Sequence, residues 1–80
     1  MKVYVKTWCP WCVDALRWLR ERNYQFEEVD VLADGAAYKH MREISHQSLT
    51  PTLETADGKV LADFDVRQLE KFLATHHILP

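Results

Sequence analysis

Hydrophobic and polar residues alternate with two different periods along the first part of the chain. Residues 2–6 alternate at every second position and include β-branched and aromatic side chains, which predicts a strand. From residue 10 to about residue 23 the period becomes helical, with an apolar stripe formed by Cys12, Ala15, Leu16 and Leu19. Residues 24–31 predict a second strand, whose irregular alternation is typical of parallel strands covered on both faces. A strand, a helix and a strand within ~30 residues predict a right-handed βαβ unit.

The next segment predicts a second helix. Asp34 can cap its N-terminus, and the polar stretch 45–48 ends it. Its apolar positions follow helical spacing and are Ala37, Tyr38, Met41 and Ile44.

The last third of the chain predicts a β-hairpin followed by a helix. Residues 51–55 and 59–62 are two short strand-like runs around an Asp-Gly pair, which tolerates the positive φ of a hairpin turn. Asp65 and Gln68 have the spacing of a capping box, so we expect the final helix to begin near Asp65. The stripe that this helix would bury consists of Leu69, Phe72, Leu73 and His76.

Length and composition limit the number of domains and the kinds of partner that the protein can have. Eighty residues, 48% hydrophobic and 28% charged, predict one folded domain over residues 1–80. A net charge of −2 without a Lys/Arg cluster argues against a nucleic-acid partner. No apolar run is long enough for a signal peptide or a membrane span. We therefore expect a cytoplasmic monomer that has no membrane partner.

The strongest chemical signal is Cys9-Pro10-Trp11-Cys12, at the junction between the first strand and the first helix. The free N–H groups of a helix N-terminus carry about half a positive charge, which stabilises a thiolate. Pro10 suits the first helical position because its missing N–H is no loss there. The spacing predicts a dithiol that cycles to a disulfide.

A zinc site and a structural disulfide are the alternative interpretations of this motif. Zinc would need two further ligands, and none of the four histidines has ligand spacing to the cysteine pair. A disulfide between Cys9 and Cys12 would close a loop of a few residues and would constrain the unfolded chain little. We therefore expect no metal, and redox chemistry is favoured.

The chain resembles the glutaredoxins over essentially its whole length. Cys9-Pro10-Trp11-Cys12 is similar to their Cys-Pro-Tyr-Cys motif, and Lys6 matches a lysine often found before it. Leu49-Thr50-Pro51 is similar to their Thr-Val-Pro segment, whose proline is cis, and Asp63-Phe64-Asp65 falls where they carry a glycine-rich turn. The resemblance implies an α/β thioredoxin-like fold with a four-stranded mixed sheet, in which the βαβ unit precedes a helix, a β-hairpin and a C-terminal helix.

The resemblance also implies a role for each cysteine. Cys9 would be the nucleophile, since it lies nearer the helix end and the solvent. Cys12, one turn into the helix, would resolve the mixed disulfide that Cys9 forms.

A glutathione site is implied as well, with glutathione as a co-substrate and no tightly bound cofactor. Lys6 would meet the glycine carboxylate, Thr50 beside a cis Pro51 would pair with the cysteine backbone, and Trp11 would form an apolar wall. The N–H groups around Phe64 and Asp65 would meet the γ-glutamyl end.

Three positions depart from the family pattern. Ala62 and Asp63 stand where glutaredoxins usually have two glycines, and Gln47 stands where many have arginine. A carboxylate at position 63 would repel the γ-glutamyl carboxylate, so we expect weak glutathione binding.

Three functions fit these residues. The first is a dithiol glutaredoxin that reduces protein or glutathione mixed disulfides. The second is a dithiol oxidoreductase that is reduced by thioredoxin reductase and that donates electrons to a protein such as ribonucleotide reductase. The third is a binding module that holds an iron–sulfur cluster through Cys9 of two subunits, with glutathione as co-ligand.

Overall fold

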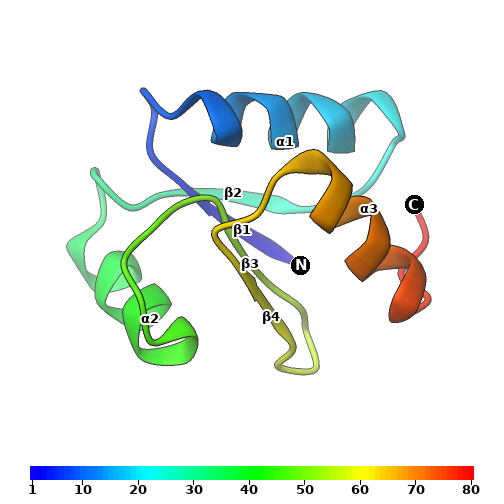
Figure 1. Ribbon diagram of the computed structural model, residues 1–80. Helices are drawn as coiled ribbons and strands as arrows, with labels where there is room; N and C mark the ends of the chain where they lie inside the picture. Colours follow the sequence, from blue (N-terminus) through cyan, green and yellow to red (C-terminus); the bar gives the residue numbers. More distant parts are fainter.

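The computed structural model describes residues 1–80 and contains seven regular elements (Figure 1). In chain order these are β1 (Lys2–Val5), α1 (Pro10–Glu21), β2 (Glu27–Asp30), α2 (Gly35–Ser45), β3 (Thr52–Glu54), β4 (Val60–Ala62) and α3 (Val66–Thr75). The order expected from the periodicity is confirmed, and so is the four-stranded mixed sheet.

The sheet has the strand order β2-β1-β3-β4. Strand β1 runs parallel to β2 and antiparallel to β3, so Val3 lies opposite Glu28 on one side and Leu53 on the other. Strands β3 and β4 form the expected hairpin, whose turn contains Gly58 at φ 88°. A connection from β1 through α1 to the parallel strand β2 is the βαβ unit that the sequence predicts.

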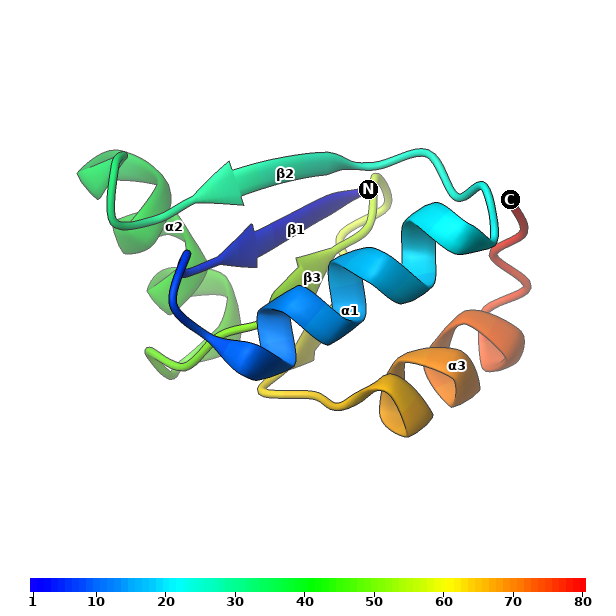
Figure 2. The same cartoon turned by 90° about the horizontal axis from the view of Figure 1, so that it is seen from above.

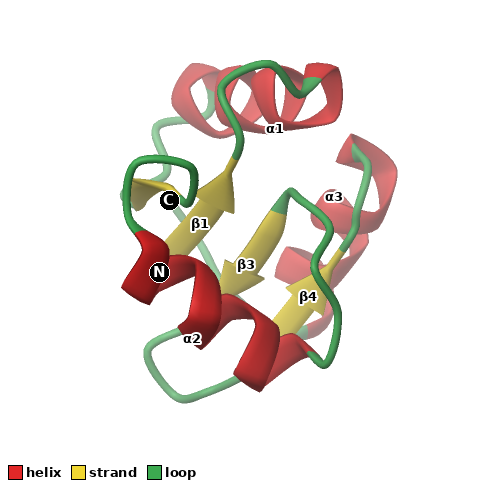
Figure 3. Ribbon diagram, turned by 90° about the vertical axis from the view of Figure 1, so that its left-hand side faces the viewer, coloured by secondary structure: helices red, strands yellow, loops and turns green.

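Helices cover both faces of this sheet. Helices α1 and α3 lie side by side on one face, while α2 lies on the other (Figures 2 and 3). Successive side chains of β1 point to opposite faces of the sheet. Val3 and Val5 therefore face α1 and α3, whereas Tyr4 faces α2. Eleven buried residues form the core under α1 and α3, and three form the smaller core under α2.

The second strand is shorter and more exposed than the sequence predicts. Strand β2 begins at Glu27 instead of residue 24, lies at the edge of the sheet and has an exposed first half. Asn23 at φ 62° turns the chain sharply after α1, and the ring of Tyr24 then stacks on Trp18 with centroids 5.8 Å apart. The aromatic residues that suggested a longer strand therefore pack against α1.

Side chains cap the second and third helices as expected. Asp34 accepts a hydrogen bond from the N–H of Ala37 at 3.1 Å. Asp65 and Gln68 form the complete capping box, at 2.8 and 2.9 Å. In the stripe of α3, Leu69 and Leu73 are fully buried, while Phe72 and His76 are half-buried. These caps fix the residues at which α2 and α3 begin.

A hydroxyl–carboxylate pair lies on the α2 face. Tyr4 donates a hydrogen bond to Glu54 at 2.7 Å, and the ring of His40 lies 3.3 Å from both oxygens of Glu54. Burial raises the pKa of Tyr4, and the Glu54 carboxylate raises it further. Burial opposes the charge on Glu54, but the bonds from Tyr4 and His40 outweigh it and lower the pKa of this carboxyl.

Tyr4→Phe is expected to lower the free energy of unfolding by about 1.5–3 kcal/mol at neutral pH, the usual worth of a hydrogen bond to a charged group. The pKa of Glu54 is lower in the folded protein than in the unfolded chain, where it is about 4.3. The carboxylate therefore stabilises the fold above about pH 4.3, and this stabilisation is lost as the pH falls through the pKa of the folded protein. Urea unfolding at neutral and acid pH should show the difference between wild type and variant narrowing in acid.

Tyr24→Phe is the matched control for this prediction, since its hydroxyl donates to the uncharged carbonyl of Ile78 at 3.3 Å. A difference for Tyr4→Phe that stays constant with pH would contradict the assignment.

Candidate active site

Cys9 lies where β1 has ended and α1 begins. The chain turns over residues 6–9, with the N–H of Cys9 donating to the carbonyl of Lys6 at 3.1 Å. Cys9 is the N-cap of α1, and its Sγ accepts a hydrogen bond from the N–H of Cys12 at 3.3 Å. Pro10 occupies the first turn, as expected. The sulfur of Cys9 therefore lies at the positive end of the helix, where a thiolate is stabilised.

The two thiols are free and differ in environment. Cys9 is 5% exposed and Cys12 is 1% exposed, so Cys9 is the more accessible by only a small margin. Burial raises the pKa of Cys12 to about 11, and its hydrogen bonding with Cys9 contributes to the increase. Cys12 therefore stays protonated at neutral pH, as a thiol that acts second would be.

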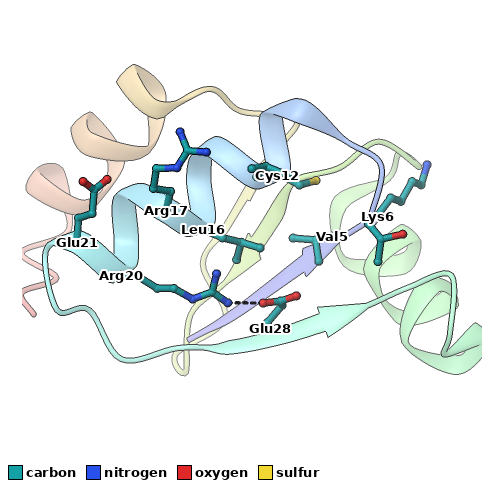
Figure 4. A pocket seen from close by; sticks show the side chains of 10 residues that line it. Val5, Lys6, Cys12, Leu16, Arg17, Arg20, Glu21 and Glu28 are labelled. Carbon is teal, nitrogen blue, oxygen red and sulfur yellow. Dashed lines mark hydrogen bonds and ion pairs between the residues drawn. The ribbon is translucent and has the colours of Figure 1, made fainter.

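A hollow of about 400 Å³ between α1 and β2 explains part of this environment (Figure 4). Cys12 lies on its wall above the apolar side chains of Val5 and Leu16. Arg20 reaches from α1 to Glu28 on β2 at 2.5 Å and borders the hollow at one end. Cys12 is packed in the core with Val5 and Leu16, which disfavours its charged form.

The loop before β3 brings a backbone carbonyl to Cys9. The Thr50–Pro51 peptide bond is cis, as the resemblance implies. Both residues are buried, and Cys9 Sγ donates to the carbonyl oxygen of Thr50 at 3.6 Å. Two sequence-distant segments therefore meet at the sulfur, with backbone polar groups of the loop beside it.

The turn before α3 lies on another side of Cys9. A pocket of about 280 Å³ there is lined by Trp11, Asp63, Phe64, Asp65 and Gln68. Phe64 is 2% exposed and belongs to the core, so only its backbone can meet a ligand. The structure thus brings together Trp11, Phe64 and Asp65, the three residues assigned by resemblance to the wall and to the γ-glutamyl end. The N–H of Asp65, however, already donates to Gln68 in the capping box at 2.9 Å.

Asp63 adopts a left-handed backbone conformation, with φ 51°. Its N–H donates to the carbonyl of Pro51 at 2.9 Å, which ties this turn to the cis-proline loop. Glycine adopts such a φ without cost, and aspartate tolerates it better than most residues. Asp63 is exposed and places a carboxylate at the rim of the pocket.

Lys6 lies apart from that pocket. Its ammonium group is 3.4 Å from the carbonyl oxygen of Ser48, 5.7 Å from the ring centre of Trp8 and 5.3 Å from that of Tyr38. It therefore contacts the loop that carries Thr50 and not the turn before α3. Of the predicted site residues, Thr50 and Pro51 lie in the loop that reaches Cys9, and Lys6 contacts the same loop.

Gln47 has a structural role that the sequence did not reveal. Its amide group donates to Ser45 at 2.8 Å and to Thr52 at 3.1 Å, while its carbonyl oxygen accepts from the N–H of Leu49 at 2.6 Å. The sequence indicated only that this position lacks the arginine that many glutaredoxins have there. A polar side chain four positions before a cis proline was the available signal, but its partners depend on the fold.

Tyr38 was expected only as a core residue of α2. Its ring does pack against the smaller core, but its hydroxyl donates to the carbonyl of Ser48 at 3.1 Å. Tyrosine instead of phenylalanine at this apolar position was the signal, since a buried hydroxyl usually finds a partner.

Two further observations concern metals and membranes. The chain assembles no group of three or more His, Cys, Asp or Glu side chains that could hold a metal ion. A cluster shared through Cys9 of two copies involves a second chain, and it stays a prediction. None of the three helices combines the length and the apolar character that a bilayer crossing requires.

Comparison with known proteins agrees with this geometry. The family model for glutaredoxin matches residues 1–61, which include both cysteines and the cis proline. The chain belongs to the glutaredoxin family. It is 30% identical over 73 residues to an uncharacterised glutaredoxin-like 8.6 kDa protein in the rubredoxin operon of Clostridium pasteurianum, covering 91% of this chain and 96% of that one.

Solved structures extend the likeness to the whole glutaredoxin fold. The thioredoxin-like protein BC3987 superposes with a TM-score of 0.80 at 35% identity, over 90% of this chain and 97% of that one. A mutant of the same protein gives the same score. The architecture is therefore thioredoxin-like, including α3, which lies beyond the residues that the family model matches.

The raised pKa of Cys12 predicts a pH-dependent stability for the reduced protein. In the unfolded chain this thiol ionises near its ordinary value of about 8.5, whereas in the folded protein it stays protonated up to about pH 11. The contribution of Cys12 to the free energy of unfolding is therefore complete below the pKa that this thiol has in the unfolded chain. It is lost as the pH rises through the pKa of the folded protein. Urea unfolding should show that the free energy of unfolding of the reduced wild type, relative to that of Cys12→Ala, falls as the pH rises from about 8 to about 11. A difference independent of pH over that range would contradict the burial argument.

Proposed function

We propose that this glutaredoxin is a dithiol oxidoreductase that reduces disulfides through Cys9 and Cys12. The observation that carries the proposal is the hydrogen bond from the N–H of Cys12 to the sulfur of Cys9 at the N-terminus of α1. An N–H donor at a sulfur is the kind of contact that stabilises a thiolate, the species that attacks disulfides. The buried thiol of Cys12 supports its assignment as the second, resolving group.

The reaction has two exchange steps. The Cys9 thiolate attacks one sulfur of the substrate disulfide, a new S–S bond forms, and the substrate bond breaks to release the first thiolate, which takes up a proton. Cys12 then loses its proton, attacks the sulfur of Cys9 and releases the second substrate thiol. The substrate gains two electrons, and the protein loses two as it forms the Cys9–Cys12 disulfide. An external thiol reductant must restore the dithiol.

Several features favour a protein disulfide over glutathione as the substrate. Asp63 puts a negative charge at the rim of the pocket where the γ-glutamyl carboxylate would dock, and Gln47 is engaged with its own loop. Around the cysteines, Trp8, Trp11 and Leu49 are 70%, 59% and 51% exposed. An apolar rim of this kind suits a partner with a large contact surface. Within this proposal the backbone of Thr50 pairs with the substrate backbone, and the protein acts as a cytoplasmic monomer.

The reductant is tested by one assay with two arms. Turnover of a single protein disulfide is measured with glutathione plus glutathione reductase, and separately with thioredoxin reductase. Efficient turnover in the first arm supports a glutathione-linked glutaredoxin. Turnover in the second arm alone supports a carrier recharged by thioredoxin reductase, with an enzyme such as ribonucleotide reductase as its partner. No turnover in either arm, with a protein that is folded and reduced, would contradict the proposed function.

Substitution of each cysteine tests the division of roles. Cys9→Ser is expected to abolish disulfide reduction, because it removes the attacking sulfur. Cys12→Ser is expected to stop after the first step and to accumulate a mixed disulfide on Cys9, which intact-mass spectrometry detects. Activity retained in Cys9→Ser, with the adduct on Cys12, would reverse the assignment.

Replacement of Asp63 tests the expected weak binding of glutathione. Two like charges about 4 Å apart interact by about 1 kcal/mol in water, so Asp63→Gly is expected to lower KM for a glutathionylated peptide by about fivefold with little change in kcat. Asp63→Asn is the matched control, since it removes the charge but keeps the side chain and its tolerance of positive φ. Asparagine should give most of the effect, and high salt should reduce it. An unchanged KM in both variants would show that the carboxylate does not face the substrate.

A further inference from the structure

The carbonyl group of Ser48 receives two side-chain donors from different parts of the fold. Lys6, which follows β1, donates to it from 3.4 Å, and the hydroxyl of Tyr38 on α2 donates from 3.1 Å. A carbonyl oxygen has two lone pairs and can accept both bonds. Ser48 is only two residues before Thr50, so these donors attach the cis-proline loop to the end of β1 and to α2.

The ammonium group of Lys6 is held by more than this carbonyl. The rings of Trp8 and Tyr38 lie 5.7 and 5.3 Å from its nitrogen, within the range in which a cation is attracted to an aromatic ring. Tyr38 therefore contributes twice, with its ring to Lys6 and with its hydroxyl to Ser48. In this structure the partners of Lys6 are groups of the protein, and a carboxylate of a substrate would have to compete with them.

The inner side of the same loop is fixed by Gln47. Its three hydrogen bonds join the end of α2, the N–H of Leu49 and the first residue of β3. The loop is thus held from inside by Gln47 and from outside by Lys6 and Tyr38. The group that this arrangement positions is the Thr50 carbonyl, 3.6 Å from the sulfur of Cys9. A small displacement of a group beside a reacting atom can cost a large factor in rate.

We propose that Lys6 and Tyr38 are positioning residues, which hold the Ser48 carbonyl and through it the Thr50 backbone that receives the substrate. The inference rests on the proposed function, because it concerns the same reaction. It gives Lys6 a role toward every disulfide, charged or neutral. The role implied by resemblance, a charge partner for the glycine carboxylate of glutathione, would instead matter only for substrates that carry that carboxylate.

The test compares two disulfides that share a cysteine backbone but differ in charge. One is glutathione disulfide, and the other is the neutral disulfide of N-acetylcysteine amide. The reduced protein is mixed with each disulfide, and its oxidation is followed by tryptophan fluorescence, since Trp8 and Trp11 lie within two residues of Cys9. The second-order rate constant needs no reductase and therefore depends on this chain alone.

Tyr38→Phe and Lys6→Met are each expected to slow both disulfides by the same factor, about two- to tenfold, from the loss of one hydrogen bond. Lys6→Arg keeps a donor and a charge and should restore most of the rate. Tyr24→Phe is the matched control, because it also deletes a hydroxyl bound to a backbone carbonyl, at 3.3 Å from Ile78 and away from the cysteines. It should react like the wild type with both disulfides.

Two results would overturn the inference. One is a Tyr38→Phe protein whose rate constants equal those of Tyr24→Phe. The other is a Lys6→Met protein that is slowed with glutathione disulfide alone, which would assign Lys6 to the carboxylate. If Lys6→Met does not fold, Tyr38→Phe, which loses a single oxygen atom, still decides the question. A wild type that neither disulfide oxidises would contradict the proposed function itself, so the two failures are distinguishable.

Discussion

The contact between the sulfur of Cys9 and the N–H of Cys12 in the first turn of α1 is the interaction on which the site depends. It exists because β1 ends next to the helix start and because Cys9 is the N-cap, with its sulfur 3.3 Å from the nitrogen of Cys12. A helix N-terminus has N–H groups without backbone partners, and here one of them is used on a sulfur. The same geometry places Cys12 one turn inside, where burial keeps it protonated. The proposed division of roles between these two identical side chains thus follows from their positions on a single helix.

The remaining parts of the fold bring other backbone groups to this point. The 46–50 loop delivers the Thr50 carbonyl, and the turn before α3 delivers the exposed N-terminus of that helix. The two segments are joined by the bond from Asp63 to Pro51. Both faces of the sheet take part, since α1 and α3 lie on one face while Tyr38 comes from α2 on the other. The residues that hold the loop beside Cys9 thus include Lys6, which follows β1, and Tyr38 of α2.

Local patterns predicted most of the architecture. The period of two in residues 2–6, the capping residues Asp34 and Asp65 and the Asp-Gly turn act over a few positions, so their effect is visible in the sequence. Residues 24–31 were predicted less well, because Tyr24 and Phe26 pack on α1 instead of continuing β2. The cysteines and the cis proline could be found from their motifs. The contacts of Lys6 and Tyr38 with Ser48 could not be found, since they join segments that the fold brings together. The contacts of Gln47 lie within five residues of it, but they depend on the conformation of the loop.

The central claim is that Cys9 and Cys12 form one reversible two-electron couple. The most direct measurement is a redox titration, in which the protein is equilibrated in glutathione buffers of stepped potential, its thiols are trapped, and the trapped species are counted by intact mass. The account predicts a single transition from two free thiols to none with a two-electron slope, between about −200 and −270 mV, the range from glutaredoxins to thioredoxin. A protein that keeps both thiols across that range, or that accumulates glutathione on Cys9 while Cys12 stays free, would contradict it.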